Sequence, residues 1–496
     1  MLAAALPAGR ARGVGCRFVA VPVLPRSTPT AEGIDPAAIS AFVDAAERER
    51  AGVHSLMVVR HGKVVAEGWW TPFAPDVRHL VHSVSKSFTS TAIGIAQAEG
   101  ILSVDEPAID FFPGVDGPRD VRLKHLLSMS GGHDEDTMGL MRALPGEDWP
   151  RLYFSSPFVF PPGEHFLYDS GGSYLLSAAL QARTGMTLPQ FLEPRLFQPL
   201  GLATPPWAAS PAGVSLGGTG MSLLTEDIAV LAELYRRGGE WDGRQLVPAE
   251  WVAEATRAHV ENGPSTAPDW GLGYGYQFWR SQHGYRMDGA WGQYGLVIPE
   301  LDLVVAITAG ALDNAAILGL VWEHLLPGID RAAGGVDDAT RAERLAQLVL
   351  PAPEYRATAP EAAERLDGRP IALPFTSLGL ATVRLRFDGD RTTLETVGTD
   401  GSEERIEAGR TEWLPGTTAL WPHPELTASR TGSRAGWVDD ATFEFHEQCI
   451  ESAAARIWRF ETQLGAEDEV RVTVGLDLPF WSARTERVTG RIGTPA

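Results

Sequence analysis

The pattern of apolar positions predicts a helix, a hairpin and a second helix in the first hundred residues. Asp35 and Pro36 suit the cap and the first position of a helix, and apolar residues recur at helical spacing after them. Two apolar runs, at 55–59 and 64–69, flank a short turn and predict a β-hairpin. The segment 82–96 then has the pattern of a helix.

A helical block follows, and strand-like runs return after it. Helical patterns cover 172–184, 189–197, 225–238 and 248–259; strand-like runs cover 273–279, 294–298 and 303–308; a last helical pattern covers 314–325. Early and late strands therefore bracket a helical insertion, and we predict an α+β domain whose sheet combines both groups of strands.

Beyond residue 365 the pattern changes to short strand-like runs separated by turn residues. These runs lie at 381–387, 392–397, 442–445, 456–461, 470–474 and 486–490. We predict an all-β barrel or sandwich over 366–496. Residues 1–30 are expected to form a leader, 31–328 the α+β domain, and 329–365 a linker that carries a helix.

Composition narrows the possible functions. The net charge of −21 argues against binding to nucleic acids and to anionic membranes. The chain has no run of 18 apolar residues, so no membrane span is expected. Cys16 and Cys449 lie near opposite ends of the chain and are expected to be free thiols. No clear secretory signal stands out, and we therefore expect a cytoplasmic enzyme.

The segment 82–96 carries a candidate nucleophile and base. Ser83 and Lys86 are three residues apart and share one face of the predicted helix. At the first turn, backbone N–H groups and the positive end of the helix dipole stabilise a developing oxyanion. A serine hydroxyl needs a neighbour to remove its proton, and a desolvated lysine amine can do so. The other two lysines are Lys63 and Lys124, and arginine, which cannot act as a base, supplies the remaining basic side chains.

Two further segments could complete a site around Ser83. Tyr168-Asp169-Ser170 lies where a loop ends before a predicted helix, and a tyrosine beside a lysine cation would have a lowered pKa and could act as base or acid. The segment 289–294 precedes a strand whose edge could aim a backbone N–H at a carbonyl oxygen. Each motif also has an ordinary interpretation: a surface lysine, a core tyrosine and a glycine-bearing turn.

Together these motifs resemble the serine β-lactamase and penicillin-binding-protein family, in its class C, esterase and D-aminopeptidase branch, which includes the 6-aminohexanoate-dimer hydrolases. The S-x-x-K motif corresponds to Ser83–Lys86, the Tyr-x-Asn/Ser motif to Tyr168–Ser170, and the K/H-x-G motif to Ala290-Trp291-Gly292 by position. The motifs occur in the family's order, and the resemblance covers about residues 35–325.

The resemblance implies a fold and a set of site residues. The fold is an antiparallel β-lactamase-like sheet flanked by helices, with an inserted helical region. The C-terminal β domain is similar to the lipocalin-like appendage of some relatives, which would wall off the pocket or serve in forming a homo-oligomer. The implied site residues are Ser83, Lys86 and Tyr168 in catalysis, the N–H groups of Ser83 and Gln293 in the oxyanion hole, and Ser170, Trp291 and Gly292 in substrate binding. No metal or organic cofactor is implied.

One departure from the family bears on the substrate. The basic residue that begins the third motif, which in the family helps to hold a substrate carboxylate, is replaced by Ala290. This replacement argues against a penicillin-type substrate and favours a small neutral ester or amide. We therefore predict a serine hydrolase that works through an acyl-serine intermediate and has little or no β-lactamase activity. The alternatives are a transacylase or peptide cyclase that passes the acyl group to an amine or alcohol, and a non-catalytic binding domain on the same fold.

Three other segments invite competing interpretations. Ser215 lies in a G-x-S-x-G sequence, but the residues before it are poor strand material, which this nucleophile motif requires. His133-Asp134-Glu135-Asp136 resembles a set of metal ligands, although adjacent residues rarely converge on one ion and a solvated acidic loop explains them. Asp288 and His283 lie near the third motif and could touch the substrate, while a surface turn explains them equally well.

Overall fold

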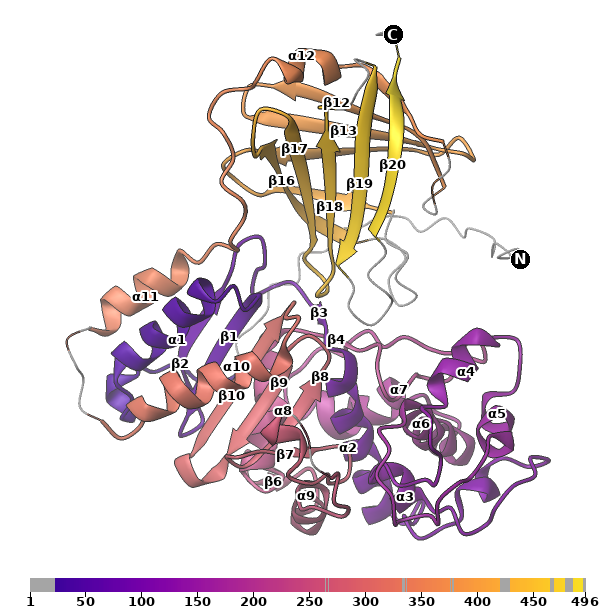
Figure 1. Ribbon diagram of the computed structural model, residues 1–496. Coiled ribbons are helices and arrows are strands. Elements are labelled where there is room, and N and C mark those ends of the chain that lie inside the picture. The colour runs from indigo at the N-terminus through magenta and orange to yellow at the C-terminus, as the bar shows by residue number, and fades with distance from the viewer. Residues whose placement is uncertain are drawn as a thin grey trace.

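The protein consists of an α+β domain and a separate C-terminal β-barrel (Figure 1). The computed structural model describes residues 23–263, 265, 267–331, 335, 337–374, 376, 379–419, 429–463, 468–477 and 485–493. The predicted fold class is confirmed. Most of the predicted leader and Cys16 lie outside the described residues, whereas the backbone N–H groups of Val23 and Leu24 donate to Glu226 Oε1.

The α+β domain is built on one six-stranded antiparallel sheet. Its spatial order is β2-β1-β10-β9-β8-β7. The strands are β1 (Val53–Arg60), β2 (Lys63–Trp69), β7 (Trp279–Arg280), β8 (Tyr285–Gly289), β9 (Gln293–Ile298) and β10 (Leu303–Ala309). Strands β1 and β10 pair directly, with Leu56 opposite Ile307, so the early and late strands form one sheet as predicted.

The sequence prediction of the late strands is corrected at one place. The run 273–279 was expected to be a strand, but only Trp279 of that run is part of β7. Its backbone instead bends, with an isolated bridge at Tyr274, and Gly273 has a φ of +99°, which lies outside the range of an extended strand. The pattern also missed β8, which lies between β7 and β9 and leads into the turn at the candidate site.

Helices cover both faces of the sheet. On one face, α1 (Pro36–Arg48), α10 (Asn314–Leu320), η7 (Val321–Leu325) and α11 (Asp338–Ala346) share a core with the strands. On the other face, α8 (Thr225–Arg236) packs against β1, β9 and β10. The Asp35 side chain accepts a hydrogen bond from the N–H of Ala37, which caps α1 as predicted.

The inserted helical region lies beside the sheet and holds the candidate site (Figure 1). Its helices are α2 (Ser85–Ala98), α3 (Leu123–Leu127), α4 (Met138–Ala143), α5 (Trp149–Ser155), α6 (Ser170–Thr184), α7 (Leu188–Leu192), η4 (Glu193–Phe197) and α9 (Ala249–Thr256). Two short strands, β3 (His79–Leu80) and β4 (Ser222–Leu223), pair at its boundary with the sheet. Among the residues that the structure describes, no helix combines the length and apolar character that crossing a membrane requires.

The C-terminal domain is a closed barrel. Its strands run in the order β14-β13-β12-β11-β20-β19-β18-β17-β16-β15, and a further β14–β16 pairing closes the ring. The strands are β11 (Pro370–Ala372), β12 (Leu380–Asp388), β13 (Arg391–Gly398), β14 (Glu403–Gly409), β15 (Leu414–Thr418), β16 (Ser429–Trp437), β17 (Thr442–Cys449), β18 (Ala455–Glu461), β19 (Glu469–Asp477) and β20 (Thr485–Ile492). Cys449 is a buried free thiol.

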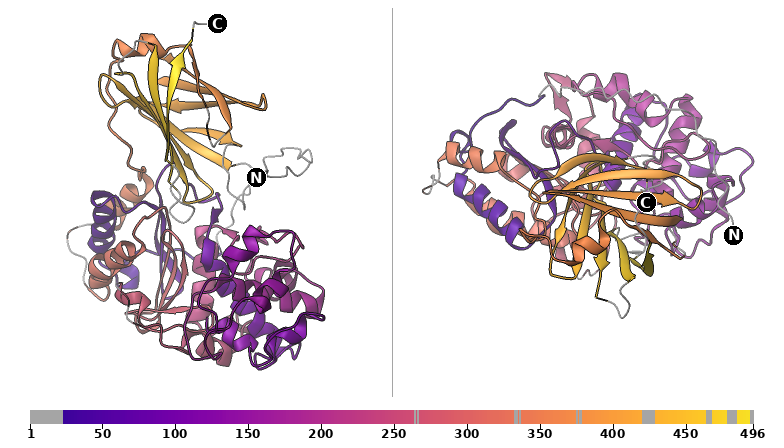
Figure 2. Two further views of the ribbon diagram at one scale, coloured as in Figure 1. Left: turned by 45° about the vertical axis from the view of Figure 1, so that its right-hand side comes forward. Right: turned by 90° about the horizontal axis from the view of Figure 1, so that it is seen from above.

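The barrel contacts the α+β domain through the turn between β17 and β18. The N–H of Leu80 in β3 donates to the carbonyl oxygen of Glu451 in this turn at 2.7 Å. The views in Figures 1 and 2 show the barrel standing on the α+β domain, with this turn directed towards β3. The contact therefore lies three residues before Ser83 in the chain.

Candidate active site

Ser83 lies in a tight turn that leads directly into α2. The 3₁₀ turn η2 (His82–Val84) precedes Ser85, and His82 has a φ of +46°. The turn is held by the Ser85 hydroxyl, which donates to the His82 carbonyl oxygen at 2.6 Å, and by the N–H of Val81, which donates to the carbonyl oxygen of Met221 at 2.9 Å. Ser83 itself is half-buried, so its hydroxyl is accessible while its backbone is fixed.

Lys86 is directed at the Ser83 hydroxyl. Its Nζ lies 3.1 Å from Ser83 Oγ, 3.2 Å from Ser170 Oγ and 2.8 Å from the carbonyl oxygen of Gly218. The side chain is only 1% exposed. A lysine this deeply buried among neutral oxygen acceptors is set up to exchange a proton with the neighbouring hydroxyl.

A glycine-rich segment forms the wall behind Lys86. The carbonyl oxygen of Gly217 accepts from Thr89 Oγ1 at 2.7 Å, and the next carbonyl accepts from Lys86. A Cβ on Gly217 would lie 2.5 Å from the Ser173 carbonyl oxygen, and a Cβ on Gly218 would lie 3.2 Å from Lys86 Nζ. These glycines are therefore required for the backbone to approach α2 and α6 closely.

Tyr168 completes the group from the loop before α6. The Ser83 side chain is close enough to lower the pKa of Tyr168, and Lys86 Nζ lies 4.7 Å from the centroid of the tyrosine ring. Burial raises the pKa of Tyr168 well above its ordinary value, and the negative charges of Asp288 and Asp136 raise the pKa further. The expectation of a lowered tyrosine pKa is therefore wrong, because burial and the two carboxylates outweigh any effect of the lysine.

Asp169 fixes the position of Tyr168 and Ser170. Its Oδ1 accepts from the N–H of Gly171 at 2.9 Å, and from the N–H and hydroxyl of Thr137 at 3.0 and 2.8 Å. The residue thus caps α6 and ties it to the loop that contains Asp136. Burial and the neighbouring Asp136 carboxylate raise the pKa of Asp169 above its ordinary value.

The third predicted motif forms the turn between β8 and β9. Trp291 is 4% exposed with a φ of +63°, and its ring meets the ring of His82 edge-on at 4.4 Å. Gly292 has a φ of +83°, and a Cβ there would lie 2.5 Å from Ile317 Cδ1. The side-chain amide of Gln293 donates to the carbonyl oxygens of Ala290, Trp291 and Ala309, which fixes the turn.

The structure brings this turn close to Ser83 at its β8 end. A Cβ on Gly289 would lie 2.3 Å from the carbonyl oxygen of Val81, so the two backbones are in contact. Ala290, the next residue, is half-buried, whereas Gln293 is fully buried. The N–H of Ala290 is therefore a second candidate for the oxyanion-hole donor that we predict at Gln293.

Sequence reasoning did not assign Asp288 a definite role, although it lies on the same edge of the site. Arg286 Nε donates to Asp288 Oδ2 at 2.8 Å. Burial raises the pKa of Asp288, while the positive charges of Arg286 and Lys86 lower it. The signal for this residue was its proximity in sequence to the third motif, but its orientation depends on β8, which the pattern missed.

Ser215 and His133 do not join this group, whereas Asp136 approaches it and accepts from the N–H of Ser170 at 2.9 Å. Ser215 is 3% exposed in an irregular segment and is not followed by a helix. His133 is buried, and its Nδ1 lies 2.8 Å from the Pro157 carbonyl oxygen, while the three acidic residues after it are exposed. Within the described part of the chain, no group of three or more His, Cys, Asp or Glu side chains is arranged to hold a metal ion.

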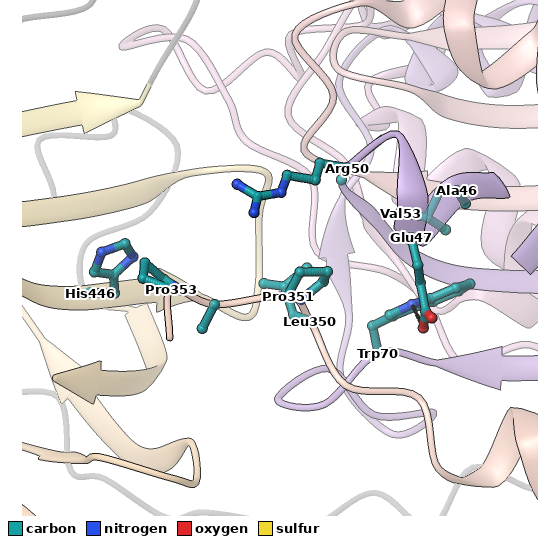
Figure 3. A pocket seen from close by; sticks show the side chains of 11 residues that line it. Ala46, Glu47, Arg50, Val53, Trp70, Leu350, Pro351, Pro353 and His446 are labelled. Atoms are coloured by element: carbon teal, nitrogen blue, oxygen red, sulfur yellow. Dashed lines mark hydrogen bonds between the residues drawn. The ribbon is translucent and has the colours of Figure 1, made fainter. Parts of the chain in front are cut away.

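A separate cavity of about 250 Å³ lies at the junction of the two domains (Figure 3). Its lining includes Arg50 after α1, Trp70 after β2, the Leu350–Pro353 segment and His446 of the barrel. The Trp70 indole N–H donates to Glu47 Oε1 at 3.2 Å. None of Ser83, Lys86 and Tyr168 lines this cavity, so it is distinct from the candidate active site.

Comparison with known proteins places these motifs in a family. A family model described as Beta-lactamase matches residues 38–316, which is more than half of the chain. The D-aminopeptidase of Brucella anthropi is 30% identical over 187 residues, covering 34% of this chain and 35% of that protein. The 6-aminohexanoate-dimer hydrolase of Paenarthrobacter ureafaciens is 24% identical over 218 residues, covering 40% of this chain and 55% of that protein.

Two further proteins are similar to this chain. Penicillin-binding protein 4 of Amycolatopsis lactamdurans is 26% identical over 290 residues, covering 49% of this chain and 75% of that protein. A solved structure of an octameric penicillin-binding protein homologue from Pyrococcus abyssi covers 91% of this chain and 99% of its own, with 17% identity and a TM-score of 0.46. The chain matches about a third to about half of the length of the D-aminopeptidase and the dimer hydrolase.

The α+β domain carries a serine just before helix α2 and a lysine in the first turn of that helix. This arrangement defines the class of protein. The chain belongs to the β-lactamase family. The resemblance drawn from its sequence motifs is confirmed.

Proposed function

We propose that this protein is a serine hydrolase that cleaves a small ester or amide through an acyl-serine intermediate. The observation that carries the proposal is the contact between Lys86 Nζ and Ser83 Oγ at 3.1 Å, with the Tyr168 ring centroid 4.7 Å from the same Nζ. Membership of the β-lactamase family supports the proposal of a hydrolase. Two of the similar proteins, a D-aminopeptidase and a 6-aminohexanoate-dimer hydrolase, carry the names of hydrolases.

In the proposed first step, Ser83 Oγ forms a bond to the substrate carbonyl carbon. Its proton passes to the Lys86 amine. A lysine amine can act as this base because, unlike an arginine guanidinium, it can lose its own proton. The negative charge on the carbonyl oxygen is stabilised by the N–H of Ser83 and a second N–H from the β8–β9 turn, at Gln293 or Ala290.

Collapse of this intermediate breaks the bond to the leaving group. Because its pKa is raised, Tyr168 is a neutral phenol that donates a proton to the leaving atom, and the proton that Lys86 took from Ser83 then returns to Tyr168. Water then attacks the acyl-serine carbonyl carbon and Lys86 takes a proton of the water. The bond from that carbon to Ser83 Oγ breaks, and Lys86 returns the proton to Oγ. Ser170 and the Trp291–Gly292 turn are the proposed substrate contacts.

The test is chemical labelling of the nucleophile. A fluorophosphonate probe mapped by peptide mass spectrometry should modify Ser83, and Ser83→Ala should lose labelling and at least about a thousandfold of kcat/KM. The matched control is Ser215→Ala, which should keep both, because Ser215 lies outside the group described above. Labelling of Ser215 instead, or full turnover by Ser83→Ala, would refute the assignment.

A substrate panel then defines the reaction. We expect p-nitrophenyl esters, anilides or D-amino acid amides to be cleaved and a chromogenic cephalosporin to be a poor substrate, since Ala290 replaces the basic residue of the third motif. Product analysis by mass spectrometry with an added amine separates hydrolysis from acyl transfer. A cephalosporin cleaved faster than every ester and amide would contradict the expected substrate class.

A further inference from the structure

The edge of the candidate site carries a buried ion pair, Arg286 with Asp288. Both residues lie on β8, two positions apart, so their side chains share one face of the strand. Gly289 follows directly, and its backbone contacts the carbonyl of Val81, two residues before Ser83. This register brings Asp288 to the part of β8 nearest the nucleophile.

The guanidinium of Arg286 is enclosed. Its side chain is 0% exposed, and Nη1 donates to the carbonyl oxygens of Asp269 and Arg280 at 3.1 and 2.7 Å, and to Ser281 Oγ at 2.8 Å. Its Cζ lies 4.5 Å from the centroid of the Trp270 ring. A substrate therefore has no route to this cation.

Asp288 is the more exposed member of the pair. Its side chain keeps 8% exposure, and one of its oxygens, Oδ2, accepts from Arg286. A carboxylate can accept several hydrogen bonds, so its second oxygen can accept an N–H from a ligand. Tyr168 stacks on the Trp279 ring with the ring centroids 5.6 Å apart, and Arg286 Cζ lies 5.6 Å from the centroid of the same ring, so the ion pair adjoins the catalytic groups.

The β8 side of the candidate site carries an acidic residue, Asp288, whereas the family motif has a basic residue two positions further along. A basic residue would bind a substrate carboxylate, but Ala290 occupies its place, and of the two ionic groups on β8 only the acid keeps any exposure. Tyr168 also has the exposed Asp136 close enough to raise its pKa. The chain as a whole carries −21 charges, which favours the approach of cations.

We propose that Asp288 is a specificity-determining residue that binds a protonated amine of the substrate. The substrates would then be esters or amides that carry an ammonium group near the scissile bond. This inference rests on the proposed hydrolase function, and it deepens that function by naming the substrate class. Arg286 acts as a positioning residue that holds the carboxylate in a fixed orientation.

The test compares matched substrates that differ in one group. The p-nitrophenyl esters of ω-amino acids with two to six carbons between amine and carbonyl are paired with esters whose chain ends in a methyl group. We expect the wild-type protein to favour the best amine ester in kcat/KM, and Asp288→Asn to lower the amine-to-methyl ratio about ten- to a hundredfold, because an ionic hydrogen bond is lost.

Two further variants guard against trivial explanations. Asp302→Asn is the matched control, because Asp302 also pairs with an arginine, Arg236, next to the same sheet, and its left-handed backbone tolerates asparagine. This control should keep the wild-type ratio. Asp288→Glu keeps the charge on a longer side chain and should shift the preferred amine position towards shorter acyl chains. An unchanged ratio in Asp288→Asn, or an equal fall in Asp302→Asn, would overturn the proposal.

A binding measurement separates this inference from the proposed function. Calorimetric titration of Ser83→Ala with hexylammonium needs no turnover, and binding should weaken about tenfold or more in Ser83→Ala/Asp288→Asn. Loss of turnover for every ester with amine binding intact would refute the hydrolase and leave the amine site standing. Turnover of both ester series at equal rates, with no amine binding, would refute the amine site and leave the hydrolase standing.

Discussion

Both domains contain fully buried charged side chains, and the two sets differ in what surrounds them. In the α+β domain, Lys86 lies beside the hydroxyls of Ser83 and Ser170, and Ser83 is half-buried. In the barrel, Glu447 and Arg456 face one another across β17 and β18 and are both 0% exposed.

In the barrel, two side chains contact the same oxygen of Glu447. Arg456 Nη1 lies 3.4 Å from Glu447 Oε2, and the Trp458 indole N–H donates to the same oxygen at 2.6 Å. Burial raises the pKa of Glu447, and Arg456 opposes that shift. Burial of a charge is therefore common to both domains, and the accessible hydroxyl beside it is what distinguishes the candidate active site. The difference between the two domains can be tested by substituting the buried charged residues of each domain and measuring catalysis and stability separately.

The largest effect is expected at Lys86. Lys86→Arg keeps the charge, but arginine does not give up its proton at neutral pH, so kcat/KM for an ester should fall at least about a thousandfold. Lys124→Arg is the matched control, because Lys124 forms an exposed ion pair with Asp105, and it should keep wild-type activity. Steady-state kinetics check this, and an arginine variant with a tenth or more of wild-type activity would show that Lys86 is not the base.

The second effect should appear in stability. Arg456→Met leaves the Glu447 carboxylate buried without its cation, which should lower the free energy of unfolding by about 3–5 kcal/mol. Activity per labelled Ser83 should stay near wild type in the protein that remains folded. The measurements are thermal unfolding and active-site titration.

The matched control for Arg456 lies on the same strand. Arg459 pairs with Glu444 at 2.8 Å and is 48% exposed, so Arg459→Met should cost no more than about 1 kcal/mol. If Arg456→Met and Arg459→Met were equally stable, the buried pair would not contribute as argued. If Arg456→Met lost activity in fully folded protein, the barrel would act on catalysis directly.

These expectations separate what the sequence could predict from what it could not. The three-residue spacing of Ser83 and Lys86 predicts their proximity, because helical geometry is local. The oxygen of Gly218 that holds Lys86 lies 132 residues further along the chain, and no local pattern predicts such a contact. Tyr168 was connected with the pair through the family resemblance, whereas its raised pKa depends on burial that only the fold creates.

The strands that the pattern missed have a common cause. In β16, the inward row begins with Ser429, Thr431 and Ser433 and becomes apolar only at Ala435 and Trp437, so alternation of apolar and polar residues is hidden. Strand β14 has few apolar residues among its glutamates, and β8 is short and contains an arginine and an aspartate. Polar residues placed inside a fold for pairing or binding remove the signal that would have revealed the strand.

The last effect is expected at Asp169, which belongs to the site's framework, and it appears as a dependence of stability on pH. Because its pKa is raised in the folded protein, the folded state holds a proton that the unfolded chain has released above about pH 4. Its contribution to stability is therefore greatest at low pH and is lost as pH rises through the raised pKa, at up to about 1.4 kcal/mol per pH unit.

Replacing Asp169 with asparagine should remove this dependence, since an amide oxygen can still accept from Gly171 and Thr137 but cannot ionise. Melting temperatures between pH 5 and pH 8 should fall with rising pH in the wild-type protein and fall less in Asp169→Asn. Asp148→Asn, at the exposed cap of α5, is the matched control and should keep the wild-type slope. Parallel slopes for wild type and Asp169→Asn would show that the carboxyl next to Tyr168 is already ionised, and the framework of the site would then resemble the paired charges of the barrel.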